Sequence, residues 1–219
     1  MPAPMQRYQV VQRKADPLNA QAYRTQRVDQ PEDLWQPLYD RANVATTVPG
    51  QVSFFSTPIG QSATLITLVT AAAKVKTYRD TNMQNSNVVP TKLYKFVGIS
   101  MAIIHGTRQL ITNAADQELV MDGGYFQFKI VDKDLLFLPL LNFPLLNPIA
   151  AVSQTTNNAT MMSKQPGGGA GNLMYKLPIN ITLNPYENFS CFMNFVGTIT
   201  LTTTLDILLT LQGFQRRPT

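Results

Sequence analysis

Cysteine and histidine are almost absent from this chain of 219 residues, which contains only Cys191 and His105. A single cysteine excludes a disulfide within the chain. One histidine and one cysteine also remove most metal sites and nearly every Ser-His-Asp or Cys-His arrangement. We expect Cys191 to be an inert, buried thiol. The sequence therefore predicts a protein that is not an enzyme and that binds no metal or cofactor.

Charged residues are also scarce. Asp, Glu, Lys and Arg make up 14% of the chain, against about 25% in an average globular domain. Thr, Gln and Asn take their place, so most of the polar surface is uncharged. Such a surface stays hydrated and repels other copies of itself only weakly, which suits repeated self-contact.

Long apolar runs are missing as well. The nearest candidate for a membrane span, residues 135–151, is interrupted by Pro139, Pro144 and Pro148. The first residues contain no apolar stretch of the kind that a secretory signal needs. Hydrophobic residues nevertheless amount to 44%, which is enough for a substantial core. We expect a soluble protein that is synthesised in the cytoplasm.

The beginning of the chain is basic and polar. Residues 1–28 combine five cations with a single acidic residue and show no sustained apolar period. They predict an extended arm that links neighbouring subunits, contacts nucleic acid or an anionic lipid surface through salt-sensitive charge pairs, or stays disordered. Near the C-terminus, Arg216 and Arg217 offer the same choices. The five cations of the arm are Arg7, Arg13, Lys14, Arg24 and Arg27.

The arm is expected to end in a short helix. Asp29 followed by Glu32 resembles a capping box, and the apolar residues around Trp35 share one helical face until Pro37 limits the helix to a turn or two. This pattern predicts a short anchor where the arm meets the body. We therefore expect an arm with its anchor helix over residues 1–48 and one main domain over residues 49–219.

Beyond residue 49 the pattern is that of an all-β domain. Apolar and polar residues alternate in residues 125–131 and 198–211, and no apolar stretch keeps a helical period for three turns. The motif Asp122-Gly123-Gly124 predicts a tight hairpin between the strands on either side. The expected strands are residues 51–57, 62–70 continuing weakly into 74–79, 93–104, 108–112, 119–121, 125–131, 173–183, 189–196 and 198–211.

One segment is both apolar and rich in proline. Residues 135–150 read LLFLPLLNFPLLNPIA, so the prolines exclude a central strand and the apolar side chains exclude free exposure. Two explanations stay open: the segment packs as core across its own domain, or a neighbouring subunit covers it. If a neighbouring subunit covers the segment, Phe143 is a candidate contact residue.

The order of these features resembles the single jelly-roll capsid proteins of icosahedral viruses. It comprises a basic arm, a short anchor, about eight strands with long polar loops and an alternating last strand. The segment 184–189 (NPYENF) and the tail 211–218 (LQGFQRRP) also look like structural proteins of bacterial viruses. The resemblance implies an antiparallel β-sandwich of two sheets, assembly into capsomers, and terminal arms that lock neighbouring subunits.

The expected function is therefore that of a virion structural protein, a capsid subunit that self-assembles into an icosahedral shell. Its expected partners are copies of itself and other virion proteins, with nucleic acid or an internal membrane surface as further candidates for the arm, and no small-molecule substrate. The expected location is the virion, after synthesis in the host cytoplasm. The alternative is a carbohydrate-binding jelly roll or virion attachment module, in which Trp35 or Tyr125 stacks on sugars; a β-sandwich enzyme is the third class.

Overall fold

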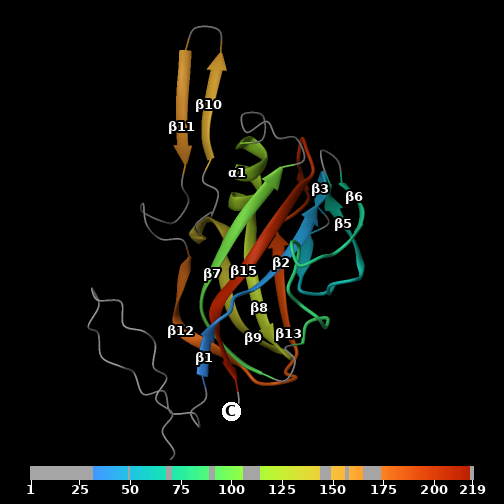
Figure 1. Ribbon diagram of the computed structural model, residues 1–219. Coiled ribbons are helices and arrows are strands. Elements are labelled where there is room, and N and C mark those ends of the chain that lie inside the picture. The colour runs from blue at the N-terminus through green and yellow to red at the C-terminus, as the bar shows by residue number, and fades with distance from the viewer. Residues whose placement is uncertain are drawn as a thin grey trace, which may run out of the picture.

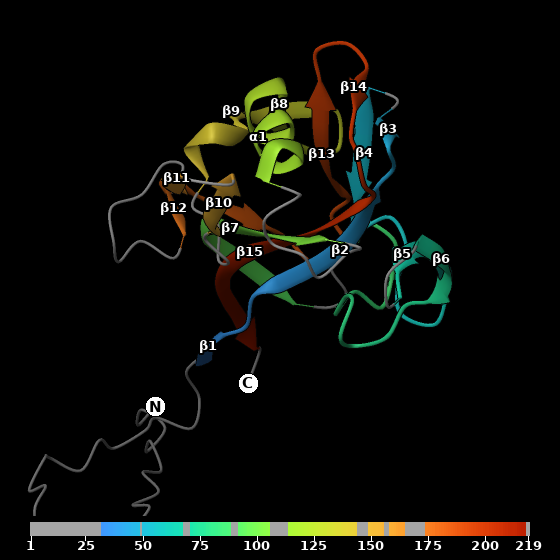
Figure 2. The ribbon, with the colours of Figure 1, turned by 90° about the horizontal axis from the view of Figure 1, so that it is seen from above.

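The computed structural model describes residues 32–48, 50–67, 71–88, 92–105, 114–143, 149–155, 158–164 and 174–217. Over these residues the chain is mostly antiparallel β-structure with one α-helix, which confirms the all-β prediction. Two larger sheets pack face to face, as Figure 1 and Figure 2 show from two directions. The proposed arm, residues 1–28, lies outside the described residues.

The first sheet is built around the last strand of the chain. Its strands are β1 (Glu32–Trp35), β2 (Leu38–Val44), β7 (Leu93–His105), β12 (Tyr175–Leu183) and β15 (Leu205–Arg217). β15 pairs with β7 along one edge and with β2 and then β1 along the other, and β12 lies beyond β7. All these pairings are antiparallel.

The second sheet contains β4 (Gln51–Phe54), β13 (Phe189–Phe195), β8 (Gly124–Ile130) and β9 (Lys133–Pro139), in that order. Three short pairs complete the strands: β3 (Thr47–Val48) with β14 (Ile199–Thr200), β5 (Ser62–Ile66) with β6 (Ala71–Val75), and β10 (Ile149–Thr155) with β11 (Asn158–Lys164). The last pair lies in a part of the chain where the sequence predicts no strand. The predicted strand 108–112 lies outside the described residues.

The core lies between the two larger sheets, as strand alternation dictates. From β15, Leu205, Ile207, Leu209 and Leu211 are buried, as the sequence predicts. Phenylalanines from both sheets fill the space between them: the ring of Phe128 lies 6.4 Å from that of Phe96 and 6.0 Å from that of Phe189. Cys191 is fully buried among them, and burial raises the pKa of its thiol well above the ordinary value. The prediction of an inert thiol fits this environment.

The predicted anchor helix is wrong. The residues around Trp35 form β1 and β2 instead, with the chain crossing between them at Pro37. A proline leaves too few residues on either side for a stable helix, whereas the edge of β15 offers a row of backbone hydrogen bonds to both segments. Leu38 and Val44 are buried core residues, so the sandwich already begins before residue 49.

The predicted strand 119–121 and the hairpin at Asp122-Gly123-Gly124 are also wrong. This region is α1 (Ala114–Gly123), which is rich in residues of high helix propensity. Gly124 is required by close packing rather than by a turn, since a Cβ there would lie 2.5 Å from Leu140 Cδ1 and 2.9 Å from Phe195 Cε1. α1 lies at the upper end of the sandwich in Figure 1, next to β8 and β14.

Asp116 ties α1 to the break between β14 and β15, where the sequence predicts one continuous strand. Its carboxylate accepts hydrogen bonds from the backbone N–H and hydroxyl of Thr202 (2.9 and 2.6 Å) and from the backbone N–H of Thr203 (2.9 Å). Burial alone would raise the pKa of Asp116, but these hydrogen bonds outweigh it and hold the pKa below its ordinary value of 3.8.

An Asp116→Asn variant should therefore be less stable than the wild type at neutral pH. Because the folded-state pKa of Asp116 is lowered, its stabilising effect is complete above the unfolded-state pKa and disappears as the pH falls through the folded-state value. Urea unfolding of both chains from pH 7 downwards checks this. The difference in unfolding free energy should shrink as the pH falls below 3.8, and a pH-independent difference would contradict the role of the charge.

The proline-rich segment 135–150 divides into an edge strand and a core residue. β9 ends at Pro139 and the short 3-10 helix η1 (Leu140–Asn142) follows, which agrees with the exclusion of a central strand. Phe143 is buried by its own chain, with its ring 5.5 Å from that of Phe126 and 5.6 Å from that of Tyr175. For Phe143, packing within its own domain is therefore the correct explanation.

Candidate functional site

The chain leaves the second sheet after β4 and returns to the first sheet at β7. On the way it forms an excursion, residues 55–88, which contains β5 and β6 and lies beside β2 (Figure 1). The excursion binds the outer edge of β2: the backbone N–H of Asn82 and the hydroxyl of Thr81 donate to the Tyr39 carbonyl (3.3 and 3.2 Å), and the Asn82 amide donates to the Pro37 carbonyl (2.8 Å). An otherwise unpaired strand edge is thereby capped.

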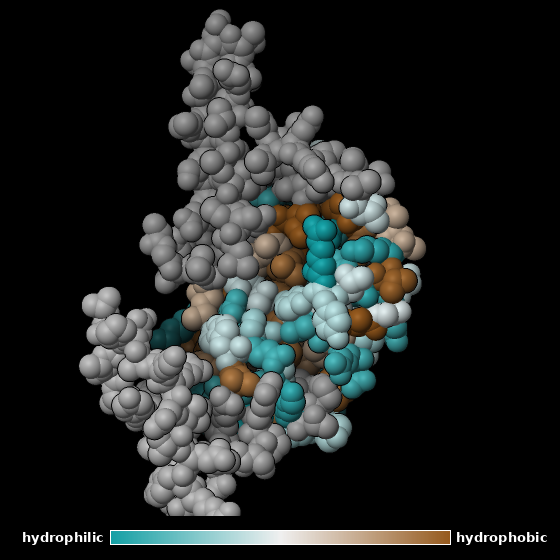
Figure 3. All heavy atoms as spheres, viewed as in Figure 1, coloured by the Kyte–Doolittle hydropathy of each residue, from teal (hydrophilic) through white to brown (hydrophobic). Residues whose placement is uncertain are grey.

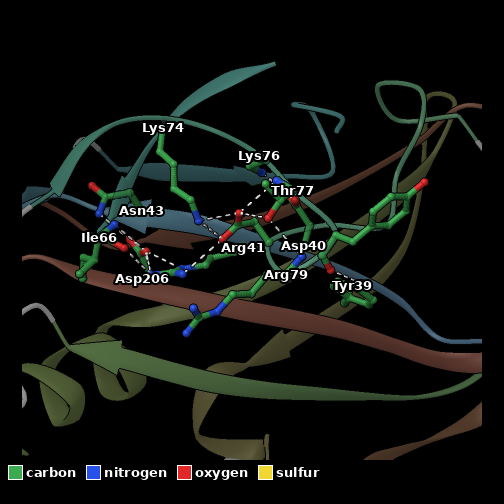
Figure 4. Close-up of polar contacts among 12 residues, drawn as sticks. Tyr39, Asp40, Arg41, Asn43, Ile66, Lys74, Lys76, Thr77, Arg79 and Asp206 are labelled. Atoms are coloured by element: carbon green, nitrogen blue, oxygen red, sulfur yellow. Dashed lines mark hydrogen bonds and ion pairs between the residues drawn. The ribbon is translucent and has the colours of Figure 1, made fainter. Parts of the chain in front are cut away.

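A buried ionic network joins the excursion to the first sheet. Arg41 of β2 donates through Nε to Asp206 Oδ2 (2.6 Å), through Nη1 to Asp80 Oδ1 (3.3 Å) and through Nη2 to the Ile66 carbonyl (2.8 Å). Asp206 of β15 also accepts from the backbone N–H of Ile66 (2.8 Å) and from the side chain of Asn43 (2.7 Å). Figure 4 shows Arg41, Asn43, Ile66 and Asp206 gathered at these contacts.

A second set of contacts extends the network along the excursion. Lys76 Nζ donates to Asp40 Oδ1 (2.6 Å), and the other oxygen of Asp40 accepts from the backbone N–H of Phe55 (2.7 Å). Lys74 Nζ lies 2.8 and 2.7 Å from the two oxygens of Asp80. Asp40, Lys76 and Asp80 are each at most 3% exposed.

The charges of this network cancel, since Asp40, Asp80 and Asp206 meet Arg41, Lys74 and Lys76. Burial raises the pKa of Asp40, and the neighbouring ammonium of Lys76 offsets only part of that effect. Burial would also raise the pKa of Asp80, but hydrogen bonds from Lys74 and Thr77 hold it below the ordinary value.

Every carboxylate of the network is held by at least two donors, so the arrangement clamps the excursion onto the sheet rather than presenting a free base or nucleophile. A cavity of about 320 Å³ lies beside the network, between β2, β4 and β5, and Arg41 and Lys76 are among the residues that line it.

Sequence reasoning missed this network. The alternation of residues 198–211 puts Asp206 on the face of β15 away from the core, but the excursion covers that face and leaves Asp206 fully buried. The available signal was its position: a carboxylate one residue into an apolar central strand requires a buried partner. The partner, Arg41, is 165 residues away in the sequence, and no local pattern connects the two.

The outer face of the second sheet carries a row of amide side chains. Gln51 donates to Asn194 (2.7 Å), Asn194 to Gln127 (3.0 Å), and Gln127 to Asp134 (2.7 Å), so the row crosses all four strands. Tyr125, a candidate sugar platform, is half-buried in this face, with its ring 6.2 Å from that of Phe137. These side chains bind one another across the sheet.

Of the predicted contact residues, Trp35 is accessible and Arg216 is paired. Trp35 is 51% exposed and meets the ring of Phe214 edge to face at 5.0 Å. Arg216 donates to both carboxylate oxygens of Asp33 (2.8 and 3.1 Å), and this contact lowers the pKa of Asp33.

The remaining predicted contact residues lie in a strand, in the core or outside the described residues. Arg217 pairs through its backbone with Glu32. Phe143 is buried in the core. The arm residues Arg7, Arg13, Lys14, Arg24 and Arg27 lie outside the described residues.

The face of the first sheet and its excursion is mostly hydrophilic where it is described, with smaller hydrophobic groups between (Figure 3). Among the described residues, no group of three or more His, Cys, Asp and Glu side chains is arranged to hold a metal ion. No helix in that part of the chain is long and apolar enough to cross a membrane. No family model, curated protein or solved structure matches this chain.

Proposed function

We propose that this chain folds as a single jelly roll and serves as a capsid subunit that assembles with copies of itself into an icosahedral shell. The observation that carries the proposal is the order of its eight main strands. Numbered along the chain, β2, β4, β7, β8, β9, β12, β13 and β15 are strands one to eight. The first sheet then has the order 1-8-3-6 and the second 2-7-4-5.

This order supports a jelly roll because the strands pair first with last and inwards. The pairs 1-8, 2-7, 3-6 and 4-5 are all antiparallel. A long hairpin folded across itself into two sheets produces this set of pairs, which is the double Greek key of the jelly roll. The outer strands of that hairpin, β2 and β15, are the ones that the buried ionic network joins to the excursion.

Fold alone does not determine function, so the role in a capsid rests on further features. The chain has few charges for its length, and the buried charged residues of the ionic network pair with one another, including the two that line the cavity. Modest contacts repeated with symmetry can then build a stable shell. In this proposal the partners are copies of the chain and other virion proteins, the arm contacts neighbouring subunits, genome or membrane, and the location is the virion.

Negative-stain microscopy and light scattering of the purified full-length chain test the proposal. We expect large, regular particles above a threshold concentration. Trp35, which is half-exposed, keeps the carbohydrate-binding module as the second candidate. A chain that remains a monomer or trimer at all concentrations and binds glycans in a Trp35-dependent manner would establish that candidate instead.

A further inference from the structure

The two lateral sides of the sandwich are closed differently. On one side β2 and β4 lie next to each other, and the excursion covers them with hydrogen bonds and the buried ionic network. On the other side β12 and β9 form the margins of the two sheets. Among the described residues, β12 pairs only with β7 and β9 only with β8. Within that part of the chain, each of these two strands presents one unpaired backbone edge.

This open side carries large apolar side chains. In β9, Leu136 and Leu138 point inward, yet the outward residues Leu135 and Phe137 are also apolar and are 47% and 53% exposed. In β12, the register with β7 shifts between Lys176 and Ile181, and the intervening Ile179 is 80% exposed. A strand that faces water on one side usually alternates with polar residues, and an apolar open edge favours association with another chain.

The charges beside β9 indicate what kind of chain fits. The turn between β8 and β9 is surrounded by two charges of each sign, those of Lys129, Lys133, Asp132 and Asp134. Lys129 Nζ lies 3.4 Å from Asp134 Oδ1. The whole chain carries a net charge of +5, so two copies repel each other least where charges of the two signs balance locally. A locally neutral patch of mixed sign is self-complementary, because a two-fold rotation can set the lysines of one copy against the aspartates of another.

We propose that the side formed by β9 and β12 is the surface through which one copy of this chain binds a second copy. Phe137 and Leu135 form the apolar centre of the contact, and the β8–β9 turn supplies its charged rim. The proposal rests on the proposed assembly function and specifies which side of the subunit assembles. On the other side of the sandwich, formed by β2 and β4, the excursion occupies the surface.

Thiol accessibility tests the contact directly, because the chain supplies a silent background. Cys191 is fully buried with a raised pKa, so an Ile179→Cys variant, in which the exposed residue of β12 is replaced and Phe137 is kept, has one reactive thiol. Val196→Cys is the matched control: Val196 is 83% exposed and lies in the turn after β13. Tyr78→Cys in the excursion, at a residue 67% exposed, is a second control.

Each variant is treated with a maleimide below and above the concentration at which light scattering detects particles. We expect all three thiols to react at similar rates in dissociated subunits. In particles the rate for Ile179→Cys should fall at least tenfold, and at least one control should stay within about twofold. A Phe137→Ser chain should keep the melting temperature of the subunit and lose the particles.

The outcomes separate this inference from the function on which it depends. Particles in which the thiol of Ile179→Cys reacts as fast as in subunits, or which form equally well from Phe137→Ser, would overturn the contact and leave the capsid proposal standing. A wild-type chain that never assembles would overturn both.

Discussion

Replacing Arg41 with leucine should lower the free energy of unfolding by about 3–5 kcal/mol. The substitution leaves the carboxylates of Asp206 and Asp80 buried, each fully inaccessible to solvent, without the guanidinium that now lies 2.6 and 3.3 Å away. Removing one partner of a buried ion pair costs far more than the pair contributes, because the remaining charge stays desolvated. Urea unfolding of the subunit measures the change.

Two controls identify the cause of that loss. Arg41→Leu combined with Asp206→Leu should recover a large part of the stability, since replacing both buried partners by apolar side chains is often close to neutral. Arg216→Leu removes a guanidinium from the exposed pair with Asp33 and should hardly move the unfolding midpoint. An Arg41→Leu chain as stable as Arg216→Leu would mean that water reaches the network.

The network also bears on the proposed assembly. By holding the excursion against β2, it keeps one margin of the first sheet closed to other chains. The margin formed by β9 and β12 has no such cover among the described residues. A subunit with one closed and one open side can associate in a limited number of ways, which is a requirement for a closed shell rather than an open aggregate.

Much of the β-structure was predictable because strand alternation is a local property. In β8 and β15 the alternation of apolar and polar residues separates the two faces of the strand, and the apolar residues Phe126, Phe128, Leu205 and Ile207 lie in the core. The prolines of the segment 135–150 likewise exclude a central strand, and the structure has the edge strand β9 there.

The wrong predictions concern short segments whose structure is decided by their surroundings rather than by their own sequence pattern. The residues around Trp35 carry a weak helical pattern, but the edge of β15 supplies hydrogen bonds that a two-turn helix cannot match. The helix α1 was not predicted because residues 119–121 on their own suggest a strand. The preceding alanines and glutamine, which favour a helix, belong to the same segment.

The candidate site was hidden for a related reason. The ionic network forms between residues 39 and 165 positions apart, and only the path of the excursion brings them together. The sequence likewise leaves open whether an apolar residue of the proline-rich segment belongs to the core or to a contact between subunits. The burial of Phe143 places it in the core, whereas Phe137 is exposed and is the proposed contact residue.

A matched pair of substitutions tests this assignment. Phe143→Ala should lower the free energy of unfolding by about 3–5 kcal/mol, because it removes a fully enclosed ring and the relaxed core only partly refills the space. The lost contacts include the rings of Phe126 and Tyr175 at 5.5 and 5.6 Å. Phe137→Ala deletes the same atoms six residues earlier, where the ring is 53% exposed, so its effect on subunit stability should be much smaller.

Thermal unfolding of both variants below the assembly threshold, followed by light scattering above it, completes the test. For a domain of this size, a loss of several kcal/mol corresponds to a fall of several degrees or more in the melting temperature. Phe143→Ala should show that fall in the isolated subunit, whereas Phe137→Ala should melt near the wild type and fail to form particles. If Phe143→Ala melted like the wild type, the segment after β9 would not be core. If Phe137→Ala were the less stable of the two, the outward face of β9 would be covered by its own chain, and the open side of the sandwich would have to be sought elsewhere.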